Sequence, residues 1–233
     1  PSSDDKIMRL SRLAHIKRYQ RAAEIFGTGN HVLDAGCGYG YGSNILGEKN
    51  EGVVGIDLSA EAINYANSKY ARENIAFYQE DLANLDFFEP SFFDAIAFFE
   101  VIEHLSNPSY ILENLRRVIK KDGMLIVSTP NADNAPRNNV HHVNSYTSES
   151  LENLLTSNRF VVKQKFGQHP LLGTLAGMAG KIIGYQSCTN KESGAIPNLI
   201  DAVPFLPEIF SDLYKSSLAV STGRTIYFVA EPG

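Results

Sequence analysis

The chain has 233 residues, enough for one large domain, and its 43% hydrophobic and 20% charged residues are typical of a folded globular protein. The net charge of −5 argues against a nucleic-acid-binding protein, and the two cysteines are too few for a disulfide framework. The sequence has no apolar stretch of about 18 residues, as a membrane-spanning helix requires, and residues 1–6 contain no apolar signal core. We therefore expect a single domain over residues 1–233, with no membrane span and a cytoplasmic location.

A glycine-rich turn follows the first predicted helix and strand. Apolar residues at helical spacing predict a helix over residues 4–26, and the apolar run at 31–35 predicts a buried strand. The segment Val32-Leu-Asp-Ala-Gly-Cys-Gly-Tyr-Gly40 then places glycines where a strand turns into a helix, predicted over 41–49. Glycines allow the backbone to approach a ligand closely, and the free N–H groups of the following helix face the same pocket. The segment predicts a nucleotide-like binding site.

An acidic residue ends the second predicted strand, which covers residues 52–57. Asp57 follows Gly36 by 21 residues, the spacing at which one strand-helix-strand unit brings a carboxylate to the ribose of an adenosine ligand. Ser59 is a typical N-cap for a helix that extends to Tyr70. A third short strand is predicted at 75–79, and Glu80-Asp-Leu82 follows it.

The remaining elements continue the alternation of strands and helices. Residues 93–99 form a fully apolar strand after Asp94, and Glu100-Val-Ile-Glu-His104 follows it. We further predict a helix at 108–120, a turn at 121–123, strands at 124–128, 160–166 and 225–230, a loop at 130–144 and a helix at 147–157. The last two strands are expected to pair antiparallel at one sheet edge. This pattern predicts an open, doubly wound α/β sheet with its site along the carboxyl ends of the strands.

A long connection, residues 168–223, separates the last two predicted strands. It contains a small-residue amphipathic stretch and an apolar stretch interrupted by prolines. Connections of this length are usually lids or interaction elements, so we expect a helical insertion that covers a substrate or forms a homodimer contact. The alternative is that its apolar residues only pack a helical cap.

Together these residues resemble the class I S-adenosylmethionine-dependent methyltransferases over about residues 15–160. The resemblance implies a Rossmann-like, seven-stranded, mostly parallel sheet with the last strand antiparallel, and S-adenosylmethionine as cofactor, with S-adenosylhomocysteine as product. The subgroup that the chain resembles includes methyltransferases found beside bacterial sugar-modifying enzymes and the ubiquinone-pathway O-methyltransferases. The segments that carry the resemblance are Val32–Gly40, Gly55–Ser59, Glu80–Leu82, Phe93–Ile96, Glu100–Leu105 and Asp122–Asn131.

The resemblance also implies which residues contact the cofactor. Asp34, Gly36 and Gly38 would hold the amino-acid part of the cofactor. Asp57 would bind the ribose hydroxyls, and Leu58 would cover the adenine. Asp81 would meet the exocyclic amine with Leu82 beside it, and the His15-Ile-Lys-Arg-Tyr19 element would lie over the site, with Glu100 lining the pocket. The implied cofactor residues are therefore Tyr19, Asp34, Gly36, Gly38, Asp57, Leu58, Asp81, Leu82 and Glu100.

An E-x-x-E-H group follows the fourth strand and carries the candidate chemistry. If a helical turn begins at Glu100, then Glu100, Glu103 and His104 lie on one face of it. The later segment His142-Val-Asn-Ser-Tyr-Thr147 resembles one that the small-RNA 2′-O-methyltransferases pair with such a group to bind a divalent metal. Carboxylate and imidazole ligands suit Mg²⁺ or Mn²⁺, so Glu100, Glu103, His104 and His142 are the candidate metal ligands.

Two further interpretations of this group remain open. Without a metal, one histidine could act as a general base, so the candidate catalytic residues are Glu103, His104 and His142. In the plain structural interpretation, Glu100 lines the cofactor pocket, and the other two residues of the E-x-x-E-H group only begin a helix. A metal would bind the acceptor hydroxyl, lower its pKa and orient it toward the methyl group.

The sequence favours methyl transfer from S-adenosylmethionine to an oxygen of a small molecule, such as a sugar, a phenol or a natural product. One alternative is a metal-dependent RNA 2′-O-methyltransferase, but no basic or aromatic cluster accompanies the site, and Ser145 replaces an acidic residue expected in the subgroup. A second alternative is a non-catalytic S-adenosylmethionine-binding protein. An NAD-dependent oxidoreductase is disfavoured because Tyr41 replaces the third glycine of the dinucleotide motif.

Overall fold

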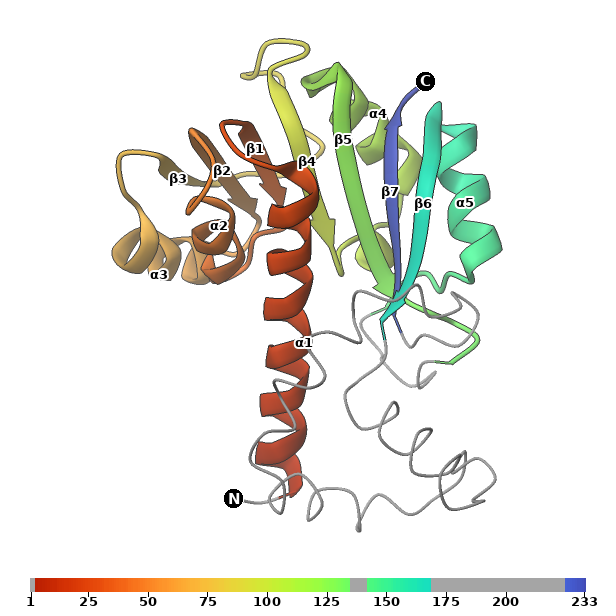
Figure 1. Cartoon of the computed structure of the whole chain (residues 1–233), viewed down its shortest axis with the longest axis horizontal. Helices are drawn as coiled ribbons and strands as arrows, with labels where there is room; N and C mark the ends of the chain where they lie inside the picture. Colours follow the sequence, from red (N-terminus) through yellow and green to blue (C-terminus); the bar gives the residue numbers. More distant parts are fainter. Residues whose placement is uncertain (1–2, 135–141, 169–224) are drawn as a thin grey trace.

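A computed structural model describes residues 3–134, 142–168 and 225–233 of the chain, with seven strands in one sheet (Figure 1). The strand order is β3-β2-β1-β4-β5-β7-β6. Neighbouring strands pair in parallel from β3 to β5, whereas β7 pairs antiparallel with both β5 and β6. The strands are β1 (His31–Ala35), β2 (Gly52–Asp57), β3 (Ile75–Gln79), β4 (Phe93–Phe99), β5 (Ile119–Pro130), β6 (Phe160–Gln168) and β7 (Thr225–Pro232). This topology confirms the predicted α/β sheet with its antiparallel last strand.

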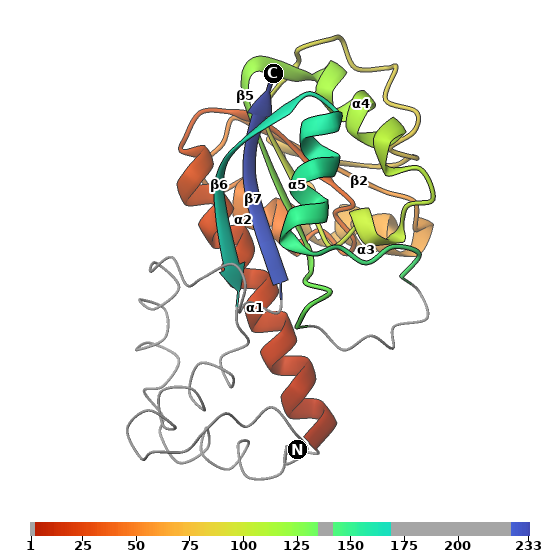
Figure 2. The ribbon, with the colours of Figure 1, turned by 90° about the vertical axis from the view of Figure 1, so that its right-hand side faces the viewer.

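Helices cover both faces of the sheet and form two core layers. One layer contains apolar residues of α1, α2 and α3, and the other contains those of α4 and α5. Successive residues of β5 alternate between them, since Ile126 belongs to the first layer and Leu125 and Val127 to the second. Figure 2 shows α1 and α5 on opposite sides of the sheet. The helices are α1 (Ser3–Phe26), α2 (Tyr41–Leu46), α3 (Ala60–Tyr70), the 3-10 turn η1 (Ile102–His104), α4 (Pro108–Val118) and α5 (Ser148–Ser157).

Local side-chain chemistry fixes where several helices begin. The Ser59 hydroxyl accepts a hydrogen bond from the Ala62 backbone N–H, which confirms the predicted cap of α3. Thr147 caps α5 in the same way by accepting from the Ser150 N–H. The helix predicted over 41–49 ends earlier, at Leu46, and the Asn50 side-chain amide donates to the Leu46 carbonyl at that end.

The predicted turn at 121–123 was wrong, because these residues lie within β5. The ladder between β4 and β5 shifts its register there: Phe93 pairs with Ile119, and Ala95 pairs with Met124. The extra residues of β5 therefore bulge out of the ladder instead of leaving the sheet. An ion pair between Lys120 and Asp94 joins the two strands at this bulge.

The helix α1 extends past the sheet edge at which β4 and β5 end (Figure 1). Its C-terminal half packs on the sheet through Tyr19, Ala22 and Ala23. The insertion predicted at 168–223 lies outside the described residues apart from Gln168, so its role as a lid or homodimer contact stays a prediction. Among the residues that the structure describes, no helix is long and apolar enough to cross a membrane.

Candidate active site

The carboxyl ends of β1 and β4 lie side by side at the centre of the sheet. On one side of this pair, β2 and then β3 follow β1 in the sheet, and on the other side β5 lies next to β4. In open α/β sheets, such a switch in strand order leaves a crevice outside the carboxyl ends, where ligands bind. Most of the residues predicted for the site follow these strands directly.

The glycine turn after β1 has backbone angles that favour glycine. Gly36 has φ +80°, and a Cβ on it would lie 2.2 Å from a methyl carbon of Val101, so no side chain fits there. A Cβ on Gly38 would meet no atom within 4 Å, so the turn has open space at that point. The backbone N–H groups of Gly36 and Cys37 both donate to the Ile56 carbonyl, which holds the turn against β2.

The carboxylate of Asp57 connects this turn to the start of α3. One of its oxygens accepts from the Gly38 N–H at 2.8 Å, and the other accepts from the Ser59 N–H at 2.9 Å. The next side chain, Leu58, is 66% exposed. An acid and an exposed apolar surface therefore lie next to each other beside the glycine turn.

The third part of the predicted cofactor site follows β3. Asp81 is exposed, and one of its oxygens accepts from the Ala83 N–H at 2.8 Å. Leu82 is buried in the core layer that contains α4. Because β2 and β3 are parallel neighbours, their carboxyl ends lie at the same end of the sheet, so this segment lies beside Asp57.

Asp34 is completely buried, and both of its carboxylate oxygens have protein partners. The Tyr19 hydroxyl donates to one at 2.9 Å, and the Ser43 hydroxyl donates to the other at 2.6 Å. Burial raises the pKa of Asp34 to about 6, although both hydrogen bonds oppose this shift. Asp34 thus joins α1 and α2 to β1, and a direct contact with a ligand would require this network to open.

The raised pKa of Asp34 makes a testable prediction about stability. The folded protein keeps the proton of Asp34 up to a higher pH than the unfolded chain does, so charging this buried group lowers stability as the pH rises from about 4 to above 6. Over that range we expect the free energy of unfolding of the wild type to fall by roughly 2–3 kcal/mol relative to Asp34→Asn. Urea unfolding of both proteins at several pH values measures the difference. A constant difference between them would contradict the prediction.

Glu100 lies at the end of β4 in a left-handed conformation, with φ +56°. Its carboxylate accepts from the Ser128 hydroxyl at 3.0 Å and forms an ion pair with the Arg18 guanidinium, also at 3.0 Å. The buried guanidinium donates two further hydrogen bonds, both to the side-chain oxygen of Gln168. A network of four side chains therefore joins α1 and β6 to the ends of β4 and β5.

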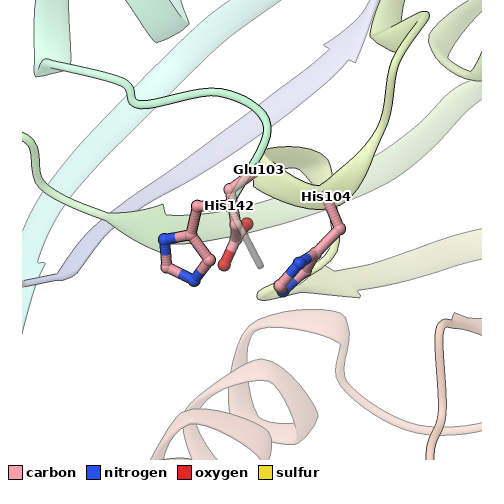
Figure 3. A group of neighbouring side chains, drawn as sticks. All are labelled: Glu103, His104 and His142. Carbon is pink, nitrogen blue, oxygen red and sulfur yellow. The ribbon is translucent and has the colours of Figure 1, made fainter. Parts of the chain in front are cut away.

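The side chains of Glu103, His104 and His142 come together beyond the end of β4 (Figure 3). One carboxylate oxygen and one nitrogen from each ring all lie within 4.8 Å of one another. The two imidazole rings are nearly perpendicular, with centroids 5.0 Å apart. This group contains three of the four predicted metal ligands, and it does not include Glu100, whose carboxylate pairs with Arg18 instead.

Glu103 is the buried member of this group. It is 1% exposed, and its carboxylate accepts from the Thr129 hydroxyl at 3.0 Å. Burial and the nearby charge of Glu100 raise the pKa of Glu103 to about 7. The backbone carbonyl of Glu103 accepts from the N–H groups of Val143 and Asn144, which holds the segment after His142 against η1.

Sequence reasoning missed the residues that hold the candidate site in place. Ser43, Ser128 and Thr129 are all fully buried, and each donates a hydrogen bond to an acidic side chain of the site. The polar pair Ser128-Thr129 at the end of an apolar strand is a signal that could have identified two of them. Arg18 belongs to the N-terminal element that we noted, but the sequence did not reveal its pairing with Glu100.

Comparisons with known proteins identify the family to which the chain belongs. Residues 27–172 match the sequence profile of a family described as a methyltransferase domain. The chain belongs to this methyltransferase family. The methyltransferase is also 30% identical over 204 residues to a probable S-adenosylmethionine-dependent methyltransferase of Mycobacterium tuberculosis, a match that covers 84% of this chain and 69% of the relative. S-adenosylmethionine is therefore the cofactor of this enzyme.

The methyltransferase is also similar to one further protein in sequence and to another in fold. It is 35% identical over 106 residues to a ubiquinone biosynthesis O-methyltransferase of Paraburkholderia phymatum, and the match covers 45% of this chain and 46% of that protein. Its fold resembles that of an S-adenosylmethionine-dependent methyltransferase from Mesorhizobium loti, with a TM-score of 0.62 and 16% identity over 91% of this chain and 95% of the other. The low identity of the second likeness shows the fold alone.

Proposed function

We propose that the enzyme transfers the methyl group of S-adenosylmethionine to a hydroxyl oxygen of a small molecule. The observation that carries this proposal is the group formed by Glu103, His104 and His142, which combines a carboxylate and two imidazoles beside the cofactor crevice. Such groups can accept the proton that a hydroxyl loses when its oxygen is methylated. The likeness to a relative named as an O-methyltransferase supports oxygen as the acceptor atom.

The residues at the glycine turn fit the cofactor. The open space above Gly38 would allow a ligand to approach the backbone, and the carboxylate of Asp57, which accepts from the Gly38 N–H, would bind the ribose hydroxyls. Leu58 offers an exposed apolar surface for a flat base, and Asp81 lies at the same edge to accept from an amino group. The sulfonium of the bound cofactor supplies an electrophilic methyl group, so the protein has to position and deprotonate the acceptor.

The same three side chains also fit a divalent cation. Two imidazole nitrogens and one carboxylate oxygen form a donor set that Mn²⁺ and similar ions accept, and a bound ion would lower the pKa of an acceptor hydroxyl. Only Glu103, His104 and His142 are proposed as ligands, because Glu100 lies outside this group and one of its carboxylate oxygens contacts Arg18 and Ser128. A structural role of Glu100 beside the cofactor is compatible with both forms of the proposal.

Binding of S-adenosylhomocysteine tests the cofactor half of the proposal. We expect Asp57→Asn to weaken this binding about 10- to 100-fold, because the ribose hydroxyls lose a charged acceptor and the Gly38 turn loses part of its support. Isothermal titration calorimetry measures the affinity. The matched control is Glu73→Gln, which changes an exposed carboxylate at the amino end of β3 and should leave the affinity unchanged. Equal affinities in both variants would remove Asp57 from the cofactor site.

The acceptor half is tested with radiolabelled S-adenosylmethionine and a panel of small molecules that carry sugar hydroxyls, phenols, amines or no nucleophile. We expect methylated products from hydroxyl compounds only. Methylation restricted to amines would refute oxygen as the acceptor atom. Cofactor binding without transfer to any compound would instead support the alternative of a non-catalytic binding protein.

A further inference from the structure

A hollow lined by four tyrosines lies where α1, α2 and α3 meet. It encloses about 390 Å³, and its lining residues are Arg12 of α1, Tyr39 of the glycine turn, Tyr41 of α2, and Tyr65 and Tyr70 of α3. Figure 1 shows α2 and α3 next to each other at one side of α1. This volume is within the range of sites that bind small organic molecules.

Two of the rings form an open corner. The rings of Tyr39 and Tyr65 meet edge to face, with centroids 5.4 Å apart and an angle of 82° between their planes. These two side chains are 49% and 42% exposed, so large apolar surfaces face solvent. Such a corner allows a flat ring to stack on one tyrosine and contact the edge of the other.

Polar partners hold both rings of the corner in place. The Tyr39 hydroxyl donates to the carboxylate of Glu61 at 3.1 Å, and the Lys69 ammonium donates to the Tyr65 hydroxyl at 2.7 Å. Because these contacts anchor the hydroxyl ends, the ring faces are positioned before any ligand arrives. Preorganised aromatic side chains lose little conformational entropy on binding, which favours a site over an accidental depression.

Two cations, Arg12 and Lys69, lie at the hollow, and the carboxylate of Glu61 lies at the hydroxyl end of Tyr39. Arg12 is exposed at the α1 side. At the α3 side, the ammonium of Lys69 lies 5.1 Å from the ring centre of Tyr65 and 5.4 Å from that of Tyr70. Burial raises the pKa of Tyr41 to about 12, so its hydroxyl adds no negative charge at neutral pH. The site therefore offers flat apolar walls together with cations.

We propose that this hollow is a binding site for a planar aromatic carboxylate, with the ring against Tyr39 and Tyr65 and the carboxylate toward Arg12. The hollow is separate from the group formed by Glu103, His104 and His142. Two of its tyrosines belong to α3, which packs on β2 and β3, whereas that group lies on η1 and on the segment after β5. The proposal therefore adds a ligand site beside the glycine turn, which contributes Tyr39, and it does not depend on the acceptor chemistry.

Naphthoate is a suitable probe, because it combines a planar ring system with one carboxylate. Titration calorimetry with the full chain, at saturating S-adenosylhomocysteine, should show binding of naphthoate at least about tenfold tighter than that of naphthylmethanol or cyclohexanecarboxylate. Naphthylmethanol lacks the negative charge, and cyclohexanecarboxylate lacks the aromatic ring. Equal binding of naphthoate and naphthylmethanol would overturn the assignment of an anion site. Binding of naphthoate that is measured without S-adenosylhomocysteine but lost at saturating S-adenosylhomocysteine would overturn the assignment of a separate site.

Substitutions at the hollow locate the binding. Tyr65→Leu and Arg12→Met should each weaken naphthoate binding about tenfold. The matched controls are Tyr78→Leu and Lys121→Met, which change an exposed tyrosine of β3 and an exposed lysine of β5 away from the hollow. Circular dichroism and the affinity for S-adenosylhomocysteine report whether each variant is folded. The proposal fails if the control pair weakens naphthoate binding as much as the first pair does.

Discussion

Replacement of Glu103 by glutamine should lower the kcat of methyl transfer by about a hundredfold or more, since general-base assistance contributes about 10² to 10⁴ in rate. Glutamine keeps the size of the side chain and an oxygen that can accept from the Thr129 hydroxyl, so the fold is retained. The affinity for S-adenosylhomocysteine should change by less than about threefold, because we propose that Glu103 acts on the acceptor and does not contact the cofactor. Steady-state kinetics with the best hydroxyl compound from the panel measures the effect.

A chelator shows whether Glu103, His104 and His142 hold a metal ion or act as a general base without one. If the side chains hold a metal, EDTA abolishes activity, Mn²⁺ restores it, and His142→Gln lowers the metal content of the purified protein by about tenfold or more. If they act as a base without a metal, EDTA has no effect, and His142→Gln changes only the rate. The matched control is Glu113→Gln, which removes an exposed carboxylate of α4. Wild-type kcat in Glu103→Gln, or an equal loss in Glu113→Gln, would refute both forms.

The strands and the polar residues at their carboxyl ends could be predicted because their signals are local. The apolar run at 93–99 and the acid at the end of the strand at 52–57 fix both the element and its polar end. Ser59 and Thr147 bond to backbone groups three residues away, which is within the reach of a sequence motif. The seven-stranded sheet with its antiparallel last strand followed from the resemblance and from the alternation of strands and helices, whereas the order of the strands is seen only in the structure.

The arrangement of the E-x-x-E-H group could be predicted only in part. The spacing argument assumed a helical turn that begins at Glu100, but this residue has φ +56°, and the 3-10 turn begins at Ile102. The side chain of Glu100 therefore leaves the face shared by Glu103 and His104 and meets Arg18 from α1. No local pattern reveals a contact between residues so far apart in the chain.

The burial of Asp34 could not be predicted from the sequence either, because its partners lie in other elements of the chain. Its position near the carboxyl end of the apolar strand β1 is the same whether the carboxylate faces a ligand or faces inward. Tyr19 and Ser43 decide the outcome, and they come from two different helices that pack on β1. The sequence therefore identified the residue, whereas its partners could be found only in the folded structure.

The ion pair between Arg18 and Glu100 should be the most important polar contact for stability at this edge of the sheet. The guanidinium is 4% exposed and the carboxylate 20%, so removal of the arginine leaves a largely buried charge without its partner. It also leaves the Gln168 side-chain oxygen without two donors. We expect Arg18→Met to lower the free energy of unfolding by about 3 kcal/mol, measured by urea denaturation at pH 7.

A matched control lies one turn further along the same helix. Arg21 forms an ion pair with Glu24 at 2.9 Å, but both side chains are exposed, so Arg21→Met should cost less than about 1 kcal/mol. The double variant Arg18→Met with Glu100→Gln should recover part of the loss, because the unpaired charge is then absent. If Arg18→Met and Arg21→Met destabilise the enzyme equally, the buried pair contributes no more than a solvent-exposed one, and the left-handed conformation of Glu100 must be held by Ser128 and the strand ladder alone.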